Sequence, residues 1–479
     1  MTDLALIIPE ISLLGLACAV LLLDVFRAQG PKAVTFWAAI LSILVVLSQM
    51  ALYFPDGSAI AFFGAVKIDP MGTVLKAFAL VLVLLSFFYA RDYFDKNHSE
   101  FSEYYILSLF ATMGMLVLIS ANSLLTVYLG LELLSLSLYS MVAMNRDSVQ
   151  SSEAAMKYFI LGALASGMLL YGMSMLYGVS GTLQLDELVT GTDVVGQERI
   201  LMVFGVVFVI VGIAFKLGVV PFHMWLPDVY QGASTPVTLF IGTAPKIAAF
   251  AMAIRILADG LQGLSGEWAS MLIILSVLSM ALGNIVAIAQ TNIKRMLAYS
   301  TIAHMGFLLL GILAATSSGY ASSMFYVIVY ALMSMGAFGT VILLSRSDTE
   351  ADNISDFSGL AKRSPWFGFV MLVFMFSMAG VPPFAGFWAK WYVLKEVIAA
   401  GYVWLAAAAV LFSIIGAYYY LRIVKLMYFD EARETEGLEA SQDMKLVLSV
   451  NGLAIFLLGV FPGALMSICV IVTIPYSGP

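Results

Sequence analysis

The sequence predicts an all-α integral membrane protein of about fourteen transmembrane helices. Of its 479 residues, 62% are hydrophobic and only 11% are charged, whereas soluble globular chains carry about 25% charged residues. A water-soluble fold of this length could not hide so much apolar surface, so lipid must surround most of the chain. The number of apolar runs and the placement of basic residues predict the same fold class.

A helix that crosses the bilayer core needs roughly 20 apolar residues. The candidate spans are residues 4–26, 34–54, 71–90, 104–120, 122–143, 154–179, 200–226, 236–257, 269–290, 296–315, 320–345, 365–400, 402–427 and 446–472. No basic region of the signal-peptide type precedes the first run, so we expect it to be retained as a span.

Basic residues are abundant in every second loop and sparse in the loops between. One set of loops holds fourteen of them: Arg27, Lys32, Arg91, Lys96, Arg146, Lys294, Arg295, Arg346, Lys362, Arg363, Arg422, Lys425, Arg433 and Lys445. The other set holds four: Lys67, Arg199, Arg255 and Lys395. Because cytoplasmic loops carry the excess of basic residues, the first set is expected in the cytoplasm and both termini outside.

The seventh and twelfth spans are too long for plain helices and contain proline near mid-length. The predicted breaks lie at Gly218 and Pro221, and at Gly380, Pro382 and Pro383. Proline removes an amide donor and crowds the preceding turn. Within a membrane such a break persists only where it is buried or lines a hydrated cavity.

The two breaks share the pattern Gly-Val-x-Pro-Phe followed by tryptophan, and they lie five spans apart. Matching segments therefore cross the membrane in opposite directions, which is typical of inverted-topology repeats with broken helices. We expect three N-terminal helices in residues 1–103, repeats in 104–258 and 259–428, and a cytoplasmic loop with the last helix in 429–479.

Titratable residues occur at membrane depth. Glu132 and Lys246 lie about ten residues inside their spans, or ~15 Å deep at ~1.5 Å per residue. Lys157 lies a turn inside the sixth span and His304 within the tenth. A charge at the helix centre costs at least ~2.5 kcal/mol on insertion scales, which favours a function for these residues.

Two further lysines flank the breaks: Lys216 precedes the first and Lys390 follows the second. Together the six residues suggest a proton relay, because burial and changing neighbours shift pKa values by several units. Structural interpretations remain open. They are a buried ion pair for Glu132, Lys216 and Lys246, access to water for Lys390, snorkelling for Lys157, and a hydrogen bond to a neighbouring helix for His304. Glu10, Lys76 and Arg255 lie near span ends and are expected to snorkel or lie at the interface.

Cofactor chemistry is not expected on this chain. Its two cysteines, Cys18 and Cys469, cannot supply a disulfide framework, a zinc knuckle or a protein-ligated iron–sulfur cluster. Neither a phosphate-binding loop nor a dinucleotide fingerprint is present. The absence of a long basic tract makes nucleic acid an unexpected partner.

Two longer motifs carry a family resemblance. Residues 215–240 read FKLGVVPFHMWLPDVYQGASTPVTLF and continue to Pro245 and Lys246, and residues 294–306 read KRMLAYSTIAHMG. With the fourteen spans, this pattern resembles the antiporter-like membrane subunits of respiratory complex I over essentially the whole chain. Two features favour the subunit N group. Lys390 occupies a position where subunit M typically carries glutamate. The chain also ends at Pro479 without the lateral helix of the largest relative. Ser234, where the family usually has proline, is a departure.

The resemblance implies roles for the six residues. Glu132 would pair with Lys216 and Lys157 would modulate that pair. Lys246 would occupy the centre, His304 would pass protons across the middle, and Lys390 would serve the second half-channel. The implied function is proton translocation in the bacterial inner membrane, as a subunit of NADH–quinone oxidoreductase. FMN, iron–sulfur clusters and quinone would belong to partner subunits, and other membrane subunits would be neighbours.

Three other functions remain open from the sequence. A subunit of a multisubunit sodium/proton antiporter would share the fold and relay but would have no redox partner. A small-solute symporter would need a pocket at the helix breaks, whereas the titratable residues are spread over several spans. A structural scaffold would not explain the cost of the buried charges.

Overall fold

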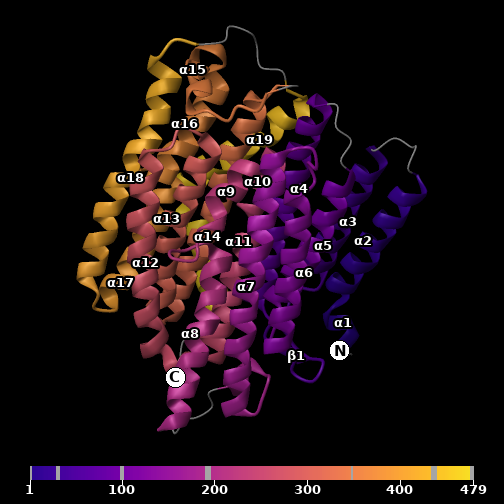
Figure 1. Ribbon diagram of the computed structural model, residues 1–479, viewed down its shortest axis with the longest axis vertical. Helices are drawn as coiled ribbons and strands as arrows, with labels where there is room; N and C mark the ends of the chain where they lie inside the picture. Colours follow the sequence, from indigo (N-terminus) through magenta and orange to yellow (C-terminus); the bar gives the residue numbers. More distant parts are fainter. Residues whose placement is uncertain are drawn as a thin grey trace. The chain divides into compact units, whose positions relative to one another are not determined.

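The computed structural model describes residues 3–27, 33–97, 102–188, 196–346, 349–432 and 440–474. Figure 1 labels its elements along the chain. The helices are α1 (Asp3–Leu6), α2 (Ile8–Phe26), α3 (Ala33–Leu52), α4 (Pro70–Lys96), α5 (Ser102–Ile119), α6 (Leu124–Val142), α7 (Val149–Ser180), α8 (Gln197–Leu217), α9 (Trp225–Gly232), α10 (Thr235–Ile241), α11 (Ala244–Ile254), α12 (Ser265–Ile288), α13 (Ile293–Leu313), α14 (Ser317–Leu344), α15 (Leu360–Arg363), α16 (Pro365–Ala379), α17 (Ala385–Ala399), α18 (Val403–Phe429), α19 (Gln442–Val460) and α20 (Pro462–Thr473).

The all-α membrane fold class is confirmed. Thirteen helical segments in the described part of the chain are long and apolar enough to cross a membrane, where α10, α11 and the turn that follows them count together as Thr235–Gly260. The predicted twelfth span corresponds to α16 and α17, each 15 residues long. That this pair of short helices forms one further span, which would bring the number to fourteen, stays a prediction.

The helical hydrogen bonding stops at the two proline-containing segments. α8 ends at Leu217 and α9 begins at Trp225, with Gly218 at φ 82°. α16 ends at Ala379. The next residue, Gly380, is the left-handed C-cap of this helix, at φ 85°. Glycine accepts this conformation without the steric strain that a Cβ would add. That each interruption lies inside a membrane span stays a prediction.

Several local features were not predicted. A short antiparallel pair, β1 (Ala59–Ala61) and β2 (Val66–Ile68), connects α3 to α4. A π-helical turn occupies Arg255–Gly260, and 3₁₀ turns occupy Leu185–Glu187, Gln262–Leu264 and Ile354–Phe357. The expected last span is divided where α19 ends and α20 begins, with proline in the first turn of α20.

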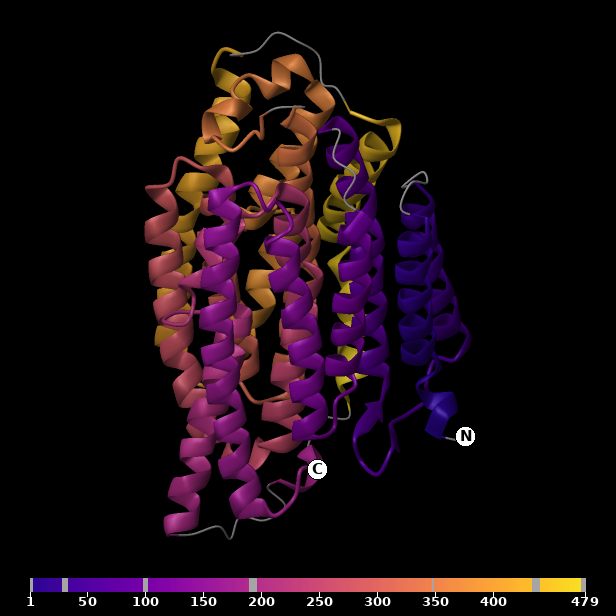
Figure 2. The same cartoon turned by 45° about the vertical axis from the view of Figure 1, so that its right-hand side comes forward.

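The chain forms two compact units. The first comprises residues 1–87, 100–216 and 244–271, and the second comprises residues 88–99, 217–243 and 272–479. In the first unit α5 packs against α6, and α2 and α3 form an adjacent pair (Figure 2). In the second unit α14 packs against α13, α16, α17, α19 and α20. Buried residues occupy almost the whole length of α13 and α14, so these helices form the core of that unit.

Candidate functional site

The first unit contains a small cavity beside Lys216. The cavity has a volume of about 10 Å³, and its lining includes Ser135, Tyr139 and Ser166. This volume corresponds to about one water molecule. The Lys216 side chain is 6% exposed, and its Nζ donates a hydrogen bond to Ser135 Oγ at 3.0 Å. A buried ammonium thus lies next to hydroxyl groups and a water-sized space.

Glu132 approaches the same cavity from α6. Its carboxylate accepts a hydrogen bond from Ser166 of α7, which also lines the cavity. Within the described chain the Lys216 ammonium contacts Ser135 rather than the Glu132 carboxylate. A direct Glu132–Lys216 pair therefore stays a prediction, although Ser166, which contacts Glu132, lines the same cavity as Lys216.

The other two predicted residues of this unit lie in different environments. Lys246 is 1% exposed, and its Nζ donates to the backbone carbonyl of Lys216 at 3.4 Å, one residue before the end of α8. Lys157 lies 2.8 Å from Glu153 on the same helix, and its side chain is 44% exposed in this single chain. Lys246 is brought to the Lys216 backbone, whereas the predicted influence of Lys157 on the pair stays a prediction.

The second unit contains a comparable cavity beside Lys390. Its volume is also about 10 Å³, and its lining includes His304, Phe307 and Tyr420. Lys390 Nζ donates to the carbonyls of Met378 (3.1 Å) and Ala379 (2.9 Å). These are the last two residues of α16, so the ammonium caps carbonyls that have no helical donor.

His304 and Lys390 line this cavity together, and their roles in a proton relay stay a prediction. Ser413 Oγ accepts a third hydrogen bond from Lys390 Nζ at 2.9 Å. His304 is 3% exposed and uses both ring nitrogens, Nδ1 with Tyr326 Oη at 2.7 Å and Nε2 with Tyr420 Oη at 3.0 Å. A buried imidazole bridging two phenols can pass a proton from one nitrogen to the other.

Glu10, Lys76 and Arg255 are buried in the chain, so the expectation that they snorkel was wrong, whereas the alternative that they lie at the membrane interface stays a prediction. Glu10 and Lys76 are 5% and 4% exposed and form a buried ion pair. They lie at similar depths near the starts of the first and third predicted spans, which enter the membrane from the same side. A comparison of the depths of oppositely charged residues in the predicted spans would therefore have predicted this ion pair.

Arg255 is fully buried and makes a bidentate contact with Asp69, with both Nη–Oδ distances at 2.7 Å. Asp259 adds a second carboxylate at 3.1 Å. Burial alone would raise the pKa of Asp69, but the Arg255 guanidinium outweighs it and holds that pKa below its ordinary value. The π-helical turn places Arg255 and Asp259 close enough to share this contact.

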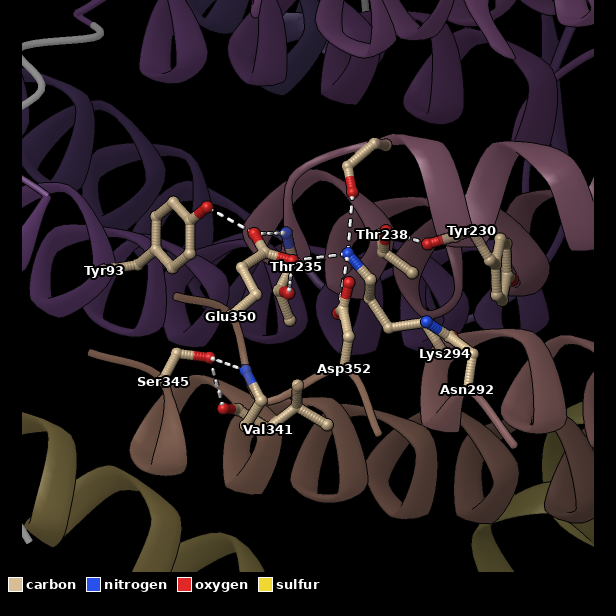
Figure 3. Close-up of polar contacts among 12 residues, drawn as sticks. Tyr93, Tyr230, Thr235, Thr238, Asn292, Lys294, Val341, Ser345, Glu350 and Asp352 are labelled. Atoms are coloured by element: carbon tan, nitrogen blue, oxygen red, sulfur yellow. Dashed lines mark hydrogen bonds and ion pairs between the residues drawn. The ribbon is translucent and has the colours of Figure 1, made fainter. Parts of the chain in front are cut away.

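Sequence reasoning also missed a charged cluster at the start of α13. Lys294 is 2% exposed and contacts the carboxylates of Glu350 and Asp352, at 2.5 and 3.2 Å (Figure 3). The sequence places all three residues in loops on the predicted cytoplasmic side, and this shared location could have indicated the cluster.

Comparison with known proteins decides the family. A family model described as NADH:quinone oxidoreductase/Mrp antiporter, TM, matches residues 121–416. A protein of Thiobacillus denitrificans named NADH-quinone oxidoreductase subunit N is 53% identical over 467 residues, covering 97% of this chain and 96% of that protein. The chain belongs to this family of antiporter-like membrane subunits.

Two solved structures have a similar fold. A chain in respiratory complex I from Thermus thermophilus with bound aureothin matches this antiporter-like subunit with a TM-score of 0.83 and 32% identity, covering 96% of this chain and 99% of that one. A chain of the Mrp complex from Dietzia sp. matches with a TM-score of 0.82 and 20% identity, covering 98% and 96%. At that lower identity the likeness shows the fold alone.

Proposed function

We propose that this antiporter-like subunit is a proton-translocating membrane subunit of an NADH–quinone oxidoreductase, in which redox chemistry on partner subunits drives proton pumping. Relatives about half identical over almost the full chain carry the name subunit N, which supports this assignment over a sodium/proton antiporter subunit. The partners would carry FMN, iron–sulfur clusters and the quinone site.

The observation that carries the mechanism is the placement of a buried lysine beside a water-sized cavity in each unit. Moving one proton against ~150–200 mV requires roughly 4 kcal/mol, or about three pKa units. The pKa of a buried lysine can change by that amount when its surroundings change from polar and hydrogen-bonded to dry. In our proposal Glu132, Lys157 and Lys216 serve the first half-channel, and Lys390 serves the second. Lys246 occupies the centre, and His304 passes protons across the middle.

We further propose that residues 104–258 and 259–428 are inverted repeats and that both termini lie outside the cytoplasm. In each region a helix is interrupted at a Gly-Val-x-Pro-Phe segment. In each, a lysine ammonium also donates to a carbonyl in the last turn before the interruption, Lys246 at α8 and Lys390 at α16. The uneven distribution of basic residues supports the orientation.

Redox-driven proton pumping in membrane vesicles tests this function. Lys246→Ala and Glu132→Ala are each expected to lower NADH oxidation and pumping together, by about tenfold or more, in complexes that still assemble. A matched control is Lys425→Ala, because Lys425 is 63% exposed and pairs with Asp430 at 2.6 Å. That variant should behave as wild type.

The assignment fails if both buried-charge variants pump at the wild-type rate in assembled complex. Purification of the chain without flavin and iron–sulfur subunits, together with sodium-dependent proton exchange, would favour the antiporter alternative.

A further inference from the structure

Three tyrosine rings surround the His304 imidazole. The ring centroids of Tyr326, Tyr330 and Tyr420 lie 5.9, 5.3 and 6.4 Å from that of His304. Two of the hydroxyls contact the imidazole, that of Tyr326 at Nδ1 and that of Tyr420 at Nε2. The Tyr330 hydroxyl instead donates to Thr301 Oγ1 at 2.7 Å. Each nitrogen of the buried ring therefore has its own phenol, and the third phenol is bonded elsewhere.

The two contacting phenols differ in their relation to the cavity beside Lys390. Tyr420 lines this cavity together with His304 and Lys390, whereas Tyr326 is not among the lining residues. The hydrogen bonds of Lys390 Nζ in the described structure go to two backbone carbonyls and to the Ser413 hydroxyl. A proton that passes between Lys390 and His304 therefore needs an intermediate group. The cavity has room for about one water molecule, and Tyr420 is the lining residue that contacts Nε2.

The Tyr420 hydroxyl has a second partner, which lets it act in both directions. It lies 2.5 Å from Ser300 Oγ, and either oxygen can be the donor. Ser300 precedes His304 by four residues, so both lie on the same face of α13. Serine and tyrosine hydroxyls can each donate one hydrogen bond and accept others. Tyr420 can therefore donate to Nε2 while it accepts from Ser300, or accept from a protonated Nε2 while it donates to Ser300.

Tyr326 completes the arrangement at the other ring nitrogen. A neutral imidazole carries hydrogen on one nitrogen and accepts a hydrogen bond at the other. When Nε2 accepts from Tyr420, Nδ1 carries the hydrogen and donates to Tyr326 Oη, which lies 2.7 Å away. Tyr326, His304 and Tyr420 are all buried, so bulk water does not compete for these bonds. The neutral ring in this state presents an acceptor nitrogen to the phenol that lines the cavity.

We propose that Tyr420 carries the proton between the Lys390 cavity and Nε2 of His304. Tyr420 gives its hydroxyl proton to Nε2 and takes one from the cavity water, which takes one from the Lys390 ammonium. The imidazole becomes an imidazolium and Lys390 becomes a neutral amine. The water and the phenol end the step with the same number of protons with which they began. This inference rests on the proposed function, because it adds one carrier to that relay.

Two neighbouring tyrosines are bonded to groups that do not pass protons onward. Tyr419 lines the same cavity, but its hydroxyl donates to Asn284 Oδ1 at 3.0 Å. The side chain of Asn284 is an amide, which has no proton to exchange at physiological pH. Thr301, the partner of Tyr330, donates its own hydroxyl to a backbone carbonyl at 2.9 Å. Tyr419 and Tyr330 are therefore matched controls, because each has a buried hydroxyl in this region that does not contact the imidazole nitrogens.

The test is redox-driven proton pumping in membrane vesicles that contain the assembled complex. Tyr420→Phe keeps the ring but removes the hydroxyl, and we expect the rate to fall about tenfold or more. Tyr419→Phe and Tyr330→Phe remove buried hydroxyls of the same kind and should pump near the wild-type rate. Tyr420→His supplies another group that accepts and releases protons, although it fills the space less well than phenylalanine. That variant should pump about threefold faster than Tyr420→Phe, or more.

A wild-type rate in Tyr420→Phe overturns the proposed carrier. A rate for Tyr420→His at or below that of Tyr420→Phe has the same consequence, because the shape of the side chain would then decide the rate. If Tyr420→Phe does not assemble, an assembled Tyr420→His complex that pumps supports the carrier, and one that fails to pump or to assemble overturns it. Loss of pumping in Lys246→Ala with normal Tyr420→Phe rejects only the carrier. Normal pumping in Lys246→Ala rejects the proposed function itself.

Discussion

Lys390 shows how one side chain can serve both the structure and the proposed chemistry. Its ammonium makes three hydrogen bonds, two of them to the final carbonyls of α16. Proline cannot supply the missing amide donors, so the break at Pro382 and Pro383 leaves those carbonyls for another group. The same ammonium lines the His304 cavity, where releasing its proton would also weaken the cap.

Lys390→Arg separates these two roles. Arginine keeps a positive charge and several donors near the α16 carbonyls, but it does not release its proton at physiological pH. We expect an assembled complex whose pumping rate falls about tenfold or more. Blue-native electrophoresis would check assembly, and vesicle acidification would report pumping. Pumping at the wild-type rate would mean that Lys390 acts as a cap alone.

At this scale the sequence predicted which residues lie at depth but not all of their contacts. Lys216, Lys246, His304 and Lys390 are all buried, as their positions within the spans indicated. Glu10 and Lys76 were misinterpreted because a position near a span end permits either snorkelling or pairing. Only the tertiary structure brings the two helices together, and sequence position alone cannot supply that contact.

Among the elements, the junction between α16 and α17 depends on one close backbone approach. A Cβ added at Gly386 would lie 1.8 Å from the carbonyl oxygen of Ser377, and the Gly386 amide already donates to Ser377 Oγ at 2.9 Å. Because the nearest atom belongs to the backbone, a side-chain rotation cannot relieve the clash. The two half-helices would have to separate.

Gly386→Ala is therefore expected to destabilise the protein by at least about 3 kcal/mol, the upper range for overpacked cores. The matched control is Gly463→Ala in the first turn of α20, where an added Cβ meets no atom within 4 Å. Thermal unfolding of both variants in detergent gives the comparison. Equal melting temperatures would show that the junction accommodates a methyl group.

The helix ends illustrate what sequence can predict at the scale of an element. Proline and glycine predicted the segments where α8 and α16 end, since both residues act through local backbone geometry. The π-helical turn at Arg255–Gly260 begins with Arg255, whose buried contact with Asp69 joins two residues that are far apart in sequence. A local sequence pattern cannot predict a contact between residues that are distant in sequence.

For the whole molecule, composition and hydropathy were sufficient to predict the membrane fold because lipid imposes the same length and polarity on every span. Orientation depends on a weaker signal, the uneven distribution of lysine and arginine between loops. That signal predicts opposite membrane sides for Asp56, before β1, and Glu431, after α18. Both residues are exposed, so each position can carry a reporter.

Cysteine labelling tests this orientation directly. In a background with Cys18 and Cys469 replaced by serine, Asp56→Cys should react with a membrane-impermeant maleimide in intact cells and be protected in sealed inside-out vesicles. Glu431→Cys should show the opposite pattern, because the basic loops are expected in the cytoplasm. The reverse result for both sites would place the termini in the cytoplasm.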